Sequence, residues 1–293
     1  MKELSSQYHL TVIDNLSNKK SYSNAQILKE NHISFFEENI MNKEKIAEII
    51  RNCRPDSCVH LAAKISVPES ILDPYSTLSV NVTGTLNILE ACRLNSVTRF
   101  VFASSAAVYG HTKTLPIPEQ IELKPISPYG ASKVVAEEII SAYANLDLFD
   151  SIISLRFFNV FGAGQSDEYA GVISKFKDRI EEGSSPVIFG DGSQQRDFVS
   201  VGDVVNSIGV ALNPPKGVTR GTFNIATGVP TTISDLAKIM TRIMGKPGLN
   251  PVYEKAAEGD IRVSLADTTK TSEVLNFIAK TDLEYGLREL VMN

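Results

Sequence analysis

The chain has 293 residues, enough for one large domain or two closely associated ones; 43% are hydrophobic and 22% are charged. This balance is typical of a globular protein in water, and the net charge of −5, with no basic stripe, argues against a nucleic-acid partner. No apolar run is long enough to span a membrane, and residues 1–10 lack the apolar core of a signal peptide. We therefore expect a cytoplasmic protein with no membrane partner.

Cysteines and histidines form no recognisable metal or disulfide motif. The spacing of Cys53, Cys58 and Cys92 gives no framework, so we expect free thiols that pack in the interior. The four histidines lack the spacing of zinc ligands, and we therefore expect no metal.

Short apolar runs alternate with amphipathic stretches through the first half of the chain. We predict strands at residues 10–13, within 33–40, and at 57–63, 99–104 and 151–156. We predict helices at residues 43–51, 81–93 and 127–145. This alternation predicts an α/β fold in which a doubly wound parallel sheet carries helices on both faces.

The pattern changes after Asn159. Glycine-rich and polar loops appear at residues 162–171, 190–192 and 214–221, and helices are predicted at 234–244 and 282–291. We expect residues 1–160 to form the parallel-sheet domain, and residues 161–293 to form a smaller part that is partly interleaved with it. Because ligands of open α/β sheets bind at the carboxyl ends of the strands, the site is expected in the cleft between the two parts.

Tyr129 and Lys133 have the spacing Y-x-x-x-K at the start of a predicted helix. Positions i and i+4 share a helix face, so the lysine charge is expected near the phenol, whose ordinary pKa of about 10 is too high for a base at neutral pH. A surface pair produces the same spacing by chance. However, predicted strands end at Ser105 and shortly before Asn159, and polar groups at several strand ends favour a catalytic site with Ser105, Tyr129 and Lys133.

Several segments resemble motifs of the extended short-chain dehydrogenases/reductases. They are VHLAA at 59–63, NVTGTLN at 81–87, SSAAVYG at 104–110, YGASK at 129–133 and RFFNVFG at 156–162. Residues 187–199 and 259–262 are similar to the nucleotide-sugar branch, and the closest resemblance is to the UDP-glucose 4-epimerases. The resemblance extends from residue 10 to the C-terminus. It implies a Rossmann-like NAD-binding domain followed by a nucleotide-sugar-binding part.

The resemblance also implies roles for single residues. Tyr129 would be the base, Lys133 would lower its pKa and hold the nicotinamide ribose, and Ser105 would bind the reacting sugar hydroxyl. Arg196 would bind the substrate diphosphate, with a surface ion pair to Asp197 as the alternative. The other implied substrate residues are Asn159, Val172, Val187, Phe189, Arg262 and Ser264. A role in the core of a strand is the alternative for Val187 and Phe189.

Asp14 follows a predicted strand, where the acid of a Rossmann domain binds the adenine-ribose hydroxyls and disfavours a 2′-phosphate. The cofactor expected is therefore NAD rather than NADP. Asn39 stands where the family usually has an aspartate, and its amide oxygen still accepts hydrogen bonds. The other implied NAD contacts are Asn15, Ser17, Asn18, Ile40, Leu61, Ala62, Ala63, Lys64, Asn81, Ala103, Ser104, Tyr129, Lys133 and Phe157.

The chain departs from the family at its start. The acid of a Rossmann fingerprint follows its glycine-rich turn by about 20 residues, yet no G-x-x-G-x-x-G precedes Asp14. Residues 1–9 resemble the end of the first helix, and the first strand normally lies between the strands at 10–13 and 57–63. We expect an N-terminally truncated form of a normal enzyme. The alternative is a short homologue that has lost tight NAD binding, because the pyrophosphate lacks its helix N-terminus.

Two features narrow the expected reaction. Ala106 and Ala107 stand where related dehydratases carry two carboxylates, which favours epimerisation at C4 of a UDP-hexose through a 4-keto intermediate. The small Ser264 leaves room for the N-acetyl group of a UDP-N-acetylhexosamine. The alternatives are another nucleotide-sugar oxidoreductase and a non-catalytic nucleotide-sugar-binding homologue. The resemblance further implies a homodimer formed through the helices at 81–93 and 127–145.

Overall fold

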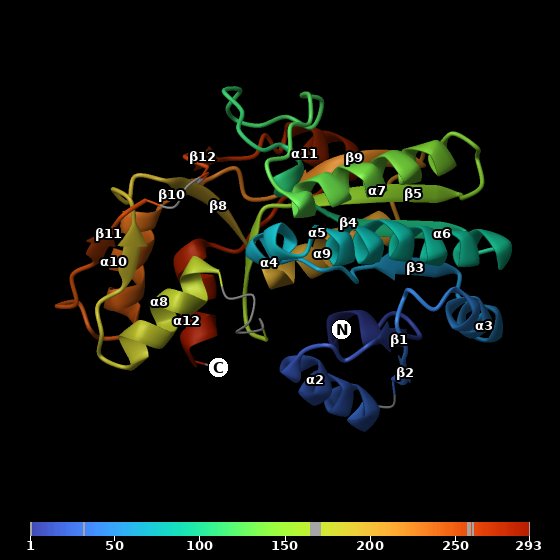
Figure 1. Ribbon diagram of the computed structural model, residues 1–293, viewed down its shortest axis with the longest axis horizontal. Helices are drawn as coiled ribbons and strands as arrows, with labels where there is room; N and C mark the ends of the chain where they lie inside the picture. The colour runs from blue at the N-terminus through green and yellow to red at the C-terminus, as the bar shows by residue number, and fades with distance from the viewer. Residues whose placement is uncertain (1, 32, 165–170, 257–258, 260, 293) are drawn as a thin grey trace.

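The computed structural model describes residues 2–31, 33–164, 171–256, 259 and 261–292 (Figure 1). Its centre is a parallel sheet with the strand order β3-β4-β5-β9. The strands are β3 (Ser57–His60), β4 (Arg99–Ser105), β5 (Ser151–Phe157) and β9 (Arg220–Ile225). Ser105 pairs with Phe157 at the carboxyl ends of β4 and β5, so the predicted polar strand ends lie side by side.

Helices cover both faces of this sheet because successive side chains of a strand point to opposite sides. Phe100 and Phe102 of β4 pack against α3 (Lys43–Cys53), α6 (Thr85–Leu94) and α7 (Pro128–Ala144). Val101 packs on the other face, against α9 (Val201–Leu212) and α11 (Thr269–Leu275). The predicted doubly wound α/β fold is confirmed.

The N-terminal strands form a separate unit. β1 (Thr11–Asp14) and β2 (Ser34–Glu37) pair in parallel and are connected by α2 (Lys19–Glu30), with the short α1 (Lys2–Ser5) in front of them. Among the residues that the structure describes, no strand bridges β1 and β3 (Figure 1). This agrees with the predicted interruption between these two strands.

The segment between β3 and α6 differs from its prediction. β3 ends at His60, three residues before the predicted end at residue 63. Two short helices that begin with proline in their first turn follow, α4 (Val67–Leu72) and α5 (Pro74–Leu78). A π-helical turn, η1 (Ser79–Gly84), then leads into α6, so the single helix predicted at 81–93 is wrong over its first residues. Such π-turns are frequent at functional sites.

A second body lies beside the sheet, at the left of Figure 1. Its strand β8 (Gln195–Ser200) pairs with β6 (Asn159–Phe161), β10 (Pro230–Thr232) and β12 (Val263–Ser264). A two-stranded sheet contains β7 (Val187–Phe189) and β11 (Val252–Glu254). The helices α8 (Val172–Glu181), α10 (Ile233–Ile243) and α12 (Leu283–Met292) enclose its core. Helix α9, strand β9 and helix α11 follow residue 160 in the chain but pack in the first body. The division into two domains at residue 160 stays a prediction.

Asp197 of β8 joins the two sheets. Its carboxylate is fully buried and accepts hydrogen bonds from Thr227 N (2.8 Å), Thr227 Oγ1 (2.7 Å) and Gly228 N (2.8 Å), in the segment after β9. A weaker contact of 3.4 Å comes from Ala266 N, shortly after β12. The end of the central sheet is thereby fixed to the strands that carry the predicted sugar-binding residues. No helix in the described part of the chain is long and apolar enough to cross a membrane.

Candidate active site

Tyr129 and Ser105 meet at the carboxyl edge of the central sheet. Tyr129 lies in the first turn of α7, which begins where the Ser127 hydroxyl accepts a hydrogen bond from Gly130 N (3.1 Å) and Pro128 occupies the first turn. Ser105 ends β4, and its hydroxyl accepts a hydrogen bond from Ala107 N (3.2 Å) in the short η2 helix (Ala106–Val108). Burial raises the pKa of Tyr129 above its ordinary value, and the nearby Ser105 hydroxyl offsets only part of this shift.

Gly130 allows α7 to approach η2 this closely. A Cβ atom on Gly130 would lie 2.6 Å from the carbonyl oxygen of Ala107, which is a backbone atom in a capped turn. Any side chain at this position would therefore separate α7 from η2. The same displacement would move Tyr129 away from Ser105.

Lys133 lies one turn after Tyr129 and is only 3% exposed. Its ammonium group donates a hydrogen bond to Ala103 O (2.8 Å) and lies 4.8 Å from the centre of the Phe102 ring. Burial lowers the pKa of Lys133 to about 8, and the nearby Glu137 carboxylate opposes this shift. The predicted trio is thus brought to one place, while the effect of Lys133 on the pKa of Tyr129 stays a prediction.

Asn81, predicted as a cofactor ligand, holds the loop after β3. It is 1% exposed; its Oδ1 accepts from Lys64 N (2.7 Å), and its Nδ2 donates to Lys64 O (2.8 Å) and Ser132 Oγ (2.9 Å). Both amide hydrogens are therefore used within the protein. The π-turn clamps the loop after β3 to α7, between Tyr129 and Lys133, and leaves Leu61 of that loop 55% exposed.

The predicted adenosine residues gather at the carboxyl ends of β1 and β2, where they shape the turns. Asp14 Oδ1 accepts from Leu16 N (2.7 Å), Asn15 Oδ1 from Ser17 N (3.2 Å) and Asn39 Oδ1 from Met41 N (2.9 Å). Asn18 caps α2 by accepting from Ser21 N (2.9 Å). Ile40 is buried in the core and contributes its carbonyl to Asn87.

The other predicted cofactor residues lie at the ends of β3, β4 and β5. Ala62 is exposed and Ala63 half-buried in the loop after β3, whereas Phe157 is half-buried at the end of β5. Ala103 presents its carbonyl to Lys133. Ser104 is buried, and its hydroxyl donates to Glu137, which turns it away from the strand end.

The residues present fit the two ends of an NAD molecule. The exposed apolar loop at Leu61 and Ala62 lies beside the helix that carries Tyr129 and Lys133, which suits a nicotinamide ring. The turns after β1 and β2 present carboxylate and amide oxygens, which suit ribose hydroxyls and adenine. The sequence given supplies no glycine-rich turn for the pyrophosphate between them.

Three predicted substrate residues gather on the sheet around β8. Ser264 of β12 pairs with Arg196 of β8, although 67 residues separate them in the chain, and Asn159 of β6 pairs with Phe198. Ser264 is 9% exposed. Arg196 Nη1 donates to Gln195 O (2.9 Å). The Asp197 carboxylate accepts hydrogen bonds from backbone N–H groups and from a threonine hydroxyl. A surface ion pair with Arg196 therefore does not account for the position of Asp197.

The remaining predicted substrate residues lie further out. Phe189 of β7 is 47% exposed, whereas its neighbour Ile188 is 1% exposed, so β7 turns Ile188 and not Phe189 to the core. Val187 is half-buried on the same strand, and Val172 is the first residue of α8. Arg262 is largely exposed and contacts Ser193 Oγ (3.1 Å) and Asp191 (3.7 Å).

Glu137 and Arg156 were not predicted as part of the site. They form a buried ion pair directly behind Lys133 and Ser104. Two signals were present in the sequence: Glu137 follows Lys133 by four residues on the same helix, and Arg156 is a charge within an otherwise buried strand.

The chain belongs to the NAD-dependent epimerase/dehydratase family, whose model matches residues 2–226. A UDP-glucose 4-epimerase of Mycolicibacterium smegmatis is 34% identical over 95% of this chain and 88% of its own length. The crystal structure of UDP-glucose 4-epimerase from Thermotoga maritima with UDP-glucose has a TM-score of 0.91 and 36% identity, over 99% of this chain and 92% of that chain. The UDP-N-acetylglucosamine 4-epimerase of Methanobrevibacter ruminantium, in complex with UDP-N-acetylmuramic acid, has a TM-score of 0.91 and 32% identity, covering 99% and 91%.

The contact at Gly130 yields a first prediction. Gly130→Ala should lower kcat for the reaction at this site about tenfold or more, because the added Cβ displaces Tyr129 from Ser105. The matched control is Gly209→Ala on α9, where a Cβ meets open space. That substitution should leave kcat unchanged and raise the free energy of unfolding by roughly 0.5–1 kcal/mol. Equal kcat values for the two variants would contradict the assignment of this contact.

Proposed function

We propose that this chain is an NAD-dependent nucleotide-sugar 4-epimerase, which inverts C4 of a UDP-hexose or UDP-N-acetylhexosamine through a 4-keto intermediate. The observation that carries the proposal is the placement of the buried Tyr129 and Lys133 on one turn of α7, at the end of β4 where Ser105 lies. Ala106 and Ala107 follow Ser105 and supply no acid or base for a dehydration. The UDP-sugar epimerases among its relatives support the same substrate class.

In this mechanism the protein handles the proton and the orientation of the sugar. Ser105 binds the C4 hydroxyl oxygen, and Tyr129 removes the proton from that oxygen and later returns it. The Lys133 cation favours the ionised form of Tyr129. NAD, when bound, would supply reversible hydride transfer at C4, so no net NADH would accumulate. Exclusion of water by the buried surroundings of Tyr129 protects the 4-keto sugar.

Arg196, Asn159 and Ser264 are proposed to hold the substrate on the second body. Arg196 suits the diphosphate because a guanidinium is always charged and has several fixed donors. Its strand partner Ser264 would border the sugar, which places the diphosphate and the C2 substituent on adjacent strands. Asn159 follows the end of β5 and would contact the substrate nearer to Ser105.

One alternative is a non-catalytic nucleotide-sugar-binding protein. Such a protein would bind a UDP-sugar without converting it. A further alternative is another nucleotide-sugar oxidoreductase, which would change the amount of NADH during turnover. The activity assay separates all three functions.

The purified chain, supplied with NAD and UDP-glucose or UDP-N-acetylglucosamine, should form the C4 epimer without a net absorbance change at about 340 nm. Tyr129→Phe should lower kcat about 100-fold or more, because the proton acceptor is lost. Tyr143→Phe is the matched control on the same helix, since its hydroxyl binds Glu90 away from the site. Net NADH formation would favour the oxidoreductase, and UDP-sugar binding without turnover would favour the binding protein.

Ser264 offers a test of the sugar specificity. Ser264→Tyr should lower kcat/KM for UDP-N-acetylglucosamine about tenfold or more and leave UDP-glucose within about threefold, because the ring fills the space for an N-acetyl group. Ser264→Ala, which keeps the side chain small, should preserve both substrates. Unchanged turnover of both substrates by the tyrosine variant would show that Ser264 does not border the sugar.

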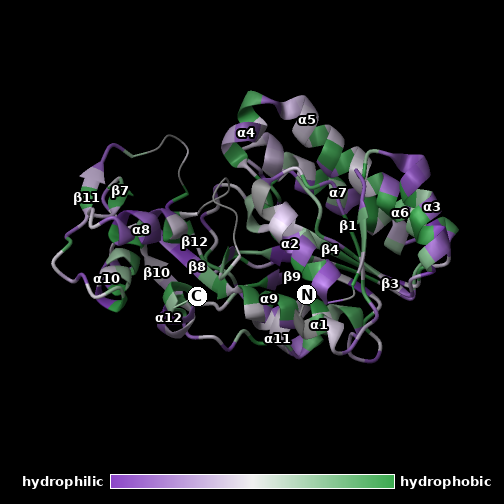
Figure 2. Ribbon diagram, turned by 90° about the horizontal axis from the view of Figure 1, so that it is seen from below, coloured by the Kyte–Doolittle hydropathy of each residue, from purple (hydrophilic) through white to green (hydrophobic). Residues whose placement is uncertain are grey.

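A homodimer is also proposed, through α6 and α7 and the short helices α4 and α5 that adjoin α7. Ile71, Leu72 and Tyr75 are 63%, 85% and 85% exposed, and Val135 of α7 is 42% exposed. Figure 2 shows hydrophobic residues on α4 and α5 at the outer rim of the molecule. Leu72→Glu with Tyr75→Glu should shift the sedimentation of the protein from dimer to monomer. A monomeric parent protein at micromolar concentration would refute the dimer.

A further inference from the structure

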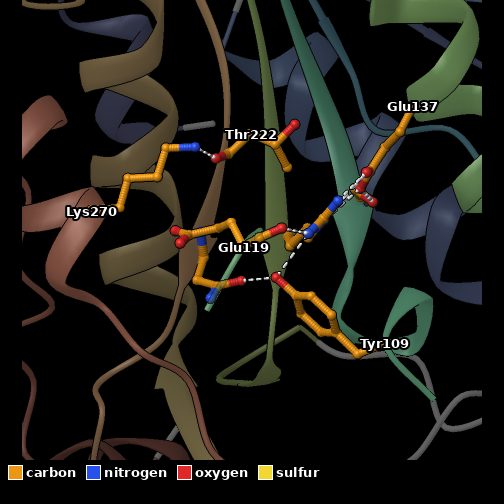
Figure 3. A network of polar contacts seen from close by, with 8 residues as sticks. Tyr109, Glu119, Glu137, Thr222 and Lys270 are labelled. Atoms are coloured by element: carbon orange, nitrogen blue, oxygen red, sulfur yellow. Dashed lines mark hydrogen bonds and ion pairs between the residues drawn. The ribbon is translucent and has the colours of Figure 1, made fainter. Parts of the chain in front are cut away.

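Two opposite charges are buried between α7 and the central sheet. Glu137 is 7% exposed and Arg156 is 5% exposed. The Arg156 guanidinium binds the carboxylate through Nη2 to Oε2 (2.6 Å) and Nε to Oε1 (3.0 Å), a two-point contact that fixes both groups (Figure 3). Replacing such a pair by apolar residues is often neutral or favourable for stability, so stability alone does not explain it.

The pair anchors a larger network that extends from β5 to β9 and the segments beside them. Arg156 Nη1 donates to Tyr109 Oη (2.9 Å) and Glu119 O (3.0 Å), and Tyr109 donates to Asn224 Oδ1 (2.5 Å). Asn224 in turn donates from its backbone N to Glu119 Oε1 (2.9 Å) and from Nδ2 to Asp267 O (3.1 Å). Figure 3 shows Tyr109, Glu119 and Glu137 of this network lying between the strands of the sheet.

The carboxylate of Glu137 acts on the predicted catalytic residues in two ways. Its Oε1 accepts a hydrogen bond from the hydroxyl of Ser104, which directly precedes Ser105 at the end of β4. Glu137 also follows Lys133 by one helical turn, and its charge acts on the Lys133 ammonium. One carboxylate therefore fixes both the end of β4 and the face of α7.

We propose that Glu137, held by Arg156, is a positioning residue that keeps Lys133 cationic and Ser105 aligned with Tyr129 during the reaction. The proposal rests on the 4-epimerase function proposed above. Neither Glu137 nor Arg156 is required to touch the substrate or the cofactor.

The groups around Lys133 fix the sign of the effect. On its own helix, Lys133 faces Tyr129 and Glu137, and on β4 it faces the Ala103 carbonyl and the Phe102 ring. His60 of β3 is neutral near pH 7, because burial and the Lys133 charge lower its pKa to about 3. On β5, Arg156 is neutralised by Glu137. Removing the carboxylate therefore leaves Lys133 near an uncompensated arginine, and the pKa of Lys133 falls below about 8.

The test compares Glu137→Gln with Glu138→Gln, the same substitution at the adjacent, exposed residue. Because the reaction needs the lysine cation, activity is lost as pH rises through the pKa of Lys133. Glu137→Gln should move the alkaline limb of kcat about one pH unit lower and reduce kcat about tenfold at pH 8, with KM for the UDP-sugar within about threefold. Glu138→Gln should keep the profile of the parent protein.

If Glu137→Gln does not fold, the double variant Glu137→Leu with Arg156→Met replaces it in the test. The double variant removes both charges of the pair and therefore buries no unpaired charge. It should fold with a melting temperature near that of the parent and retain the lowered kcat and the shifted alkaline limb. Parent-like kcat and pH dependence in either folded variant would overturn the positioning role. Absence of epimerisation in the parent and in Glu138→Gln would instead refute the proposed function.

Discussion

The geometry of the candidate active site depends on one buried ion pair, between Arg156 of β5 and Glu137 of α7. Helix α7 carries Tyr129 and Lys133, while β4 carries Ser105, and only contacts between the helix and the sheet set their relative position. The Glu137 carboxylate binds Arg156 on one strand and Ser104 on the next. The close approach at Gly130 and the Asn81 clamp at Ser132 fix the same helix from its other sides.

The two ends of the expected cofactor site differ in the contacts that hold them. At the reactive end, a π-turn, a clamped loop and the catalytic helix form one hydrogen-bonded unit. At the adenosine end, β1 and β2 form a separate pair, and among the described residues no strand connects it to β3. Hydrogen bonds within the turns after β1 and β2 keep the side-chain oxygens of Asp14 and Asn39 in place. The reactive end is therefore held by contacts between distant segments of the chain, whereas the adenosine end is held by contacts within its own turns.

Much of the fold follows from local sequence patterns, because near-continuous apolar runs such as Ser151–Phe157 specify buried parallel strands and Pro128 marks the start of α7. The π-turn at Ser79–Gly84 was not predictable, since its register depends on contacts of Asn81 with residues 17 and 51 positions away. Within the site, the spacing of Tyr129 and Lys133 predicted that they share a helix face. Ser264 and Arg196 were predicted separately, and the structure pairs them on neighbouring strands. Glu137 was missed because a carboxylate on a helix is usually exposed, and only the tertiary structure places it against Arg156.

The central claim is that Tyr129, Ser105 and Lys133 serve an oxidation and re-reduction at C4 of one bound sugar. The most direct measurement follows a UDP-sugar that carries deuterium at C4 while the protein, with NAD, converts it in ordinary water. The account predicts that both epimers retain the deuterium at C4, because the same hydride leaves and returns within one site. Loss of the label to water during epimerisation, or its transfer to released cofactor, would contradict the account.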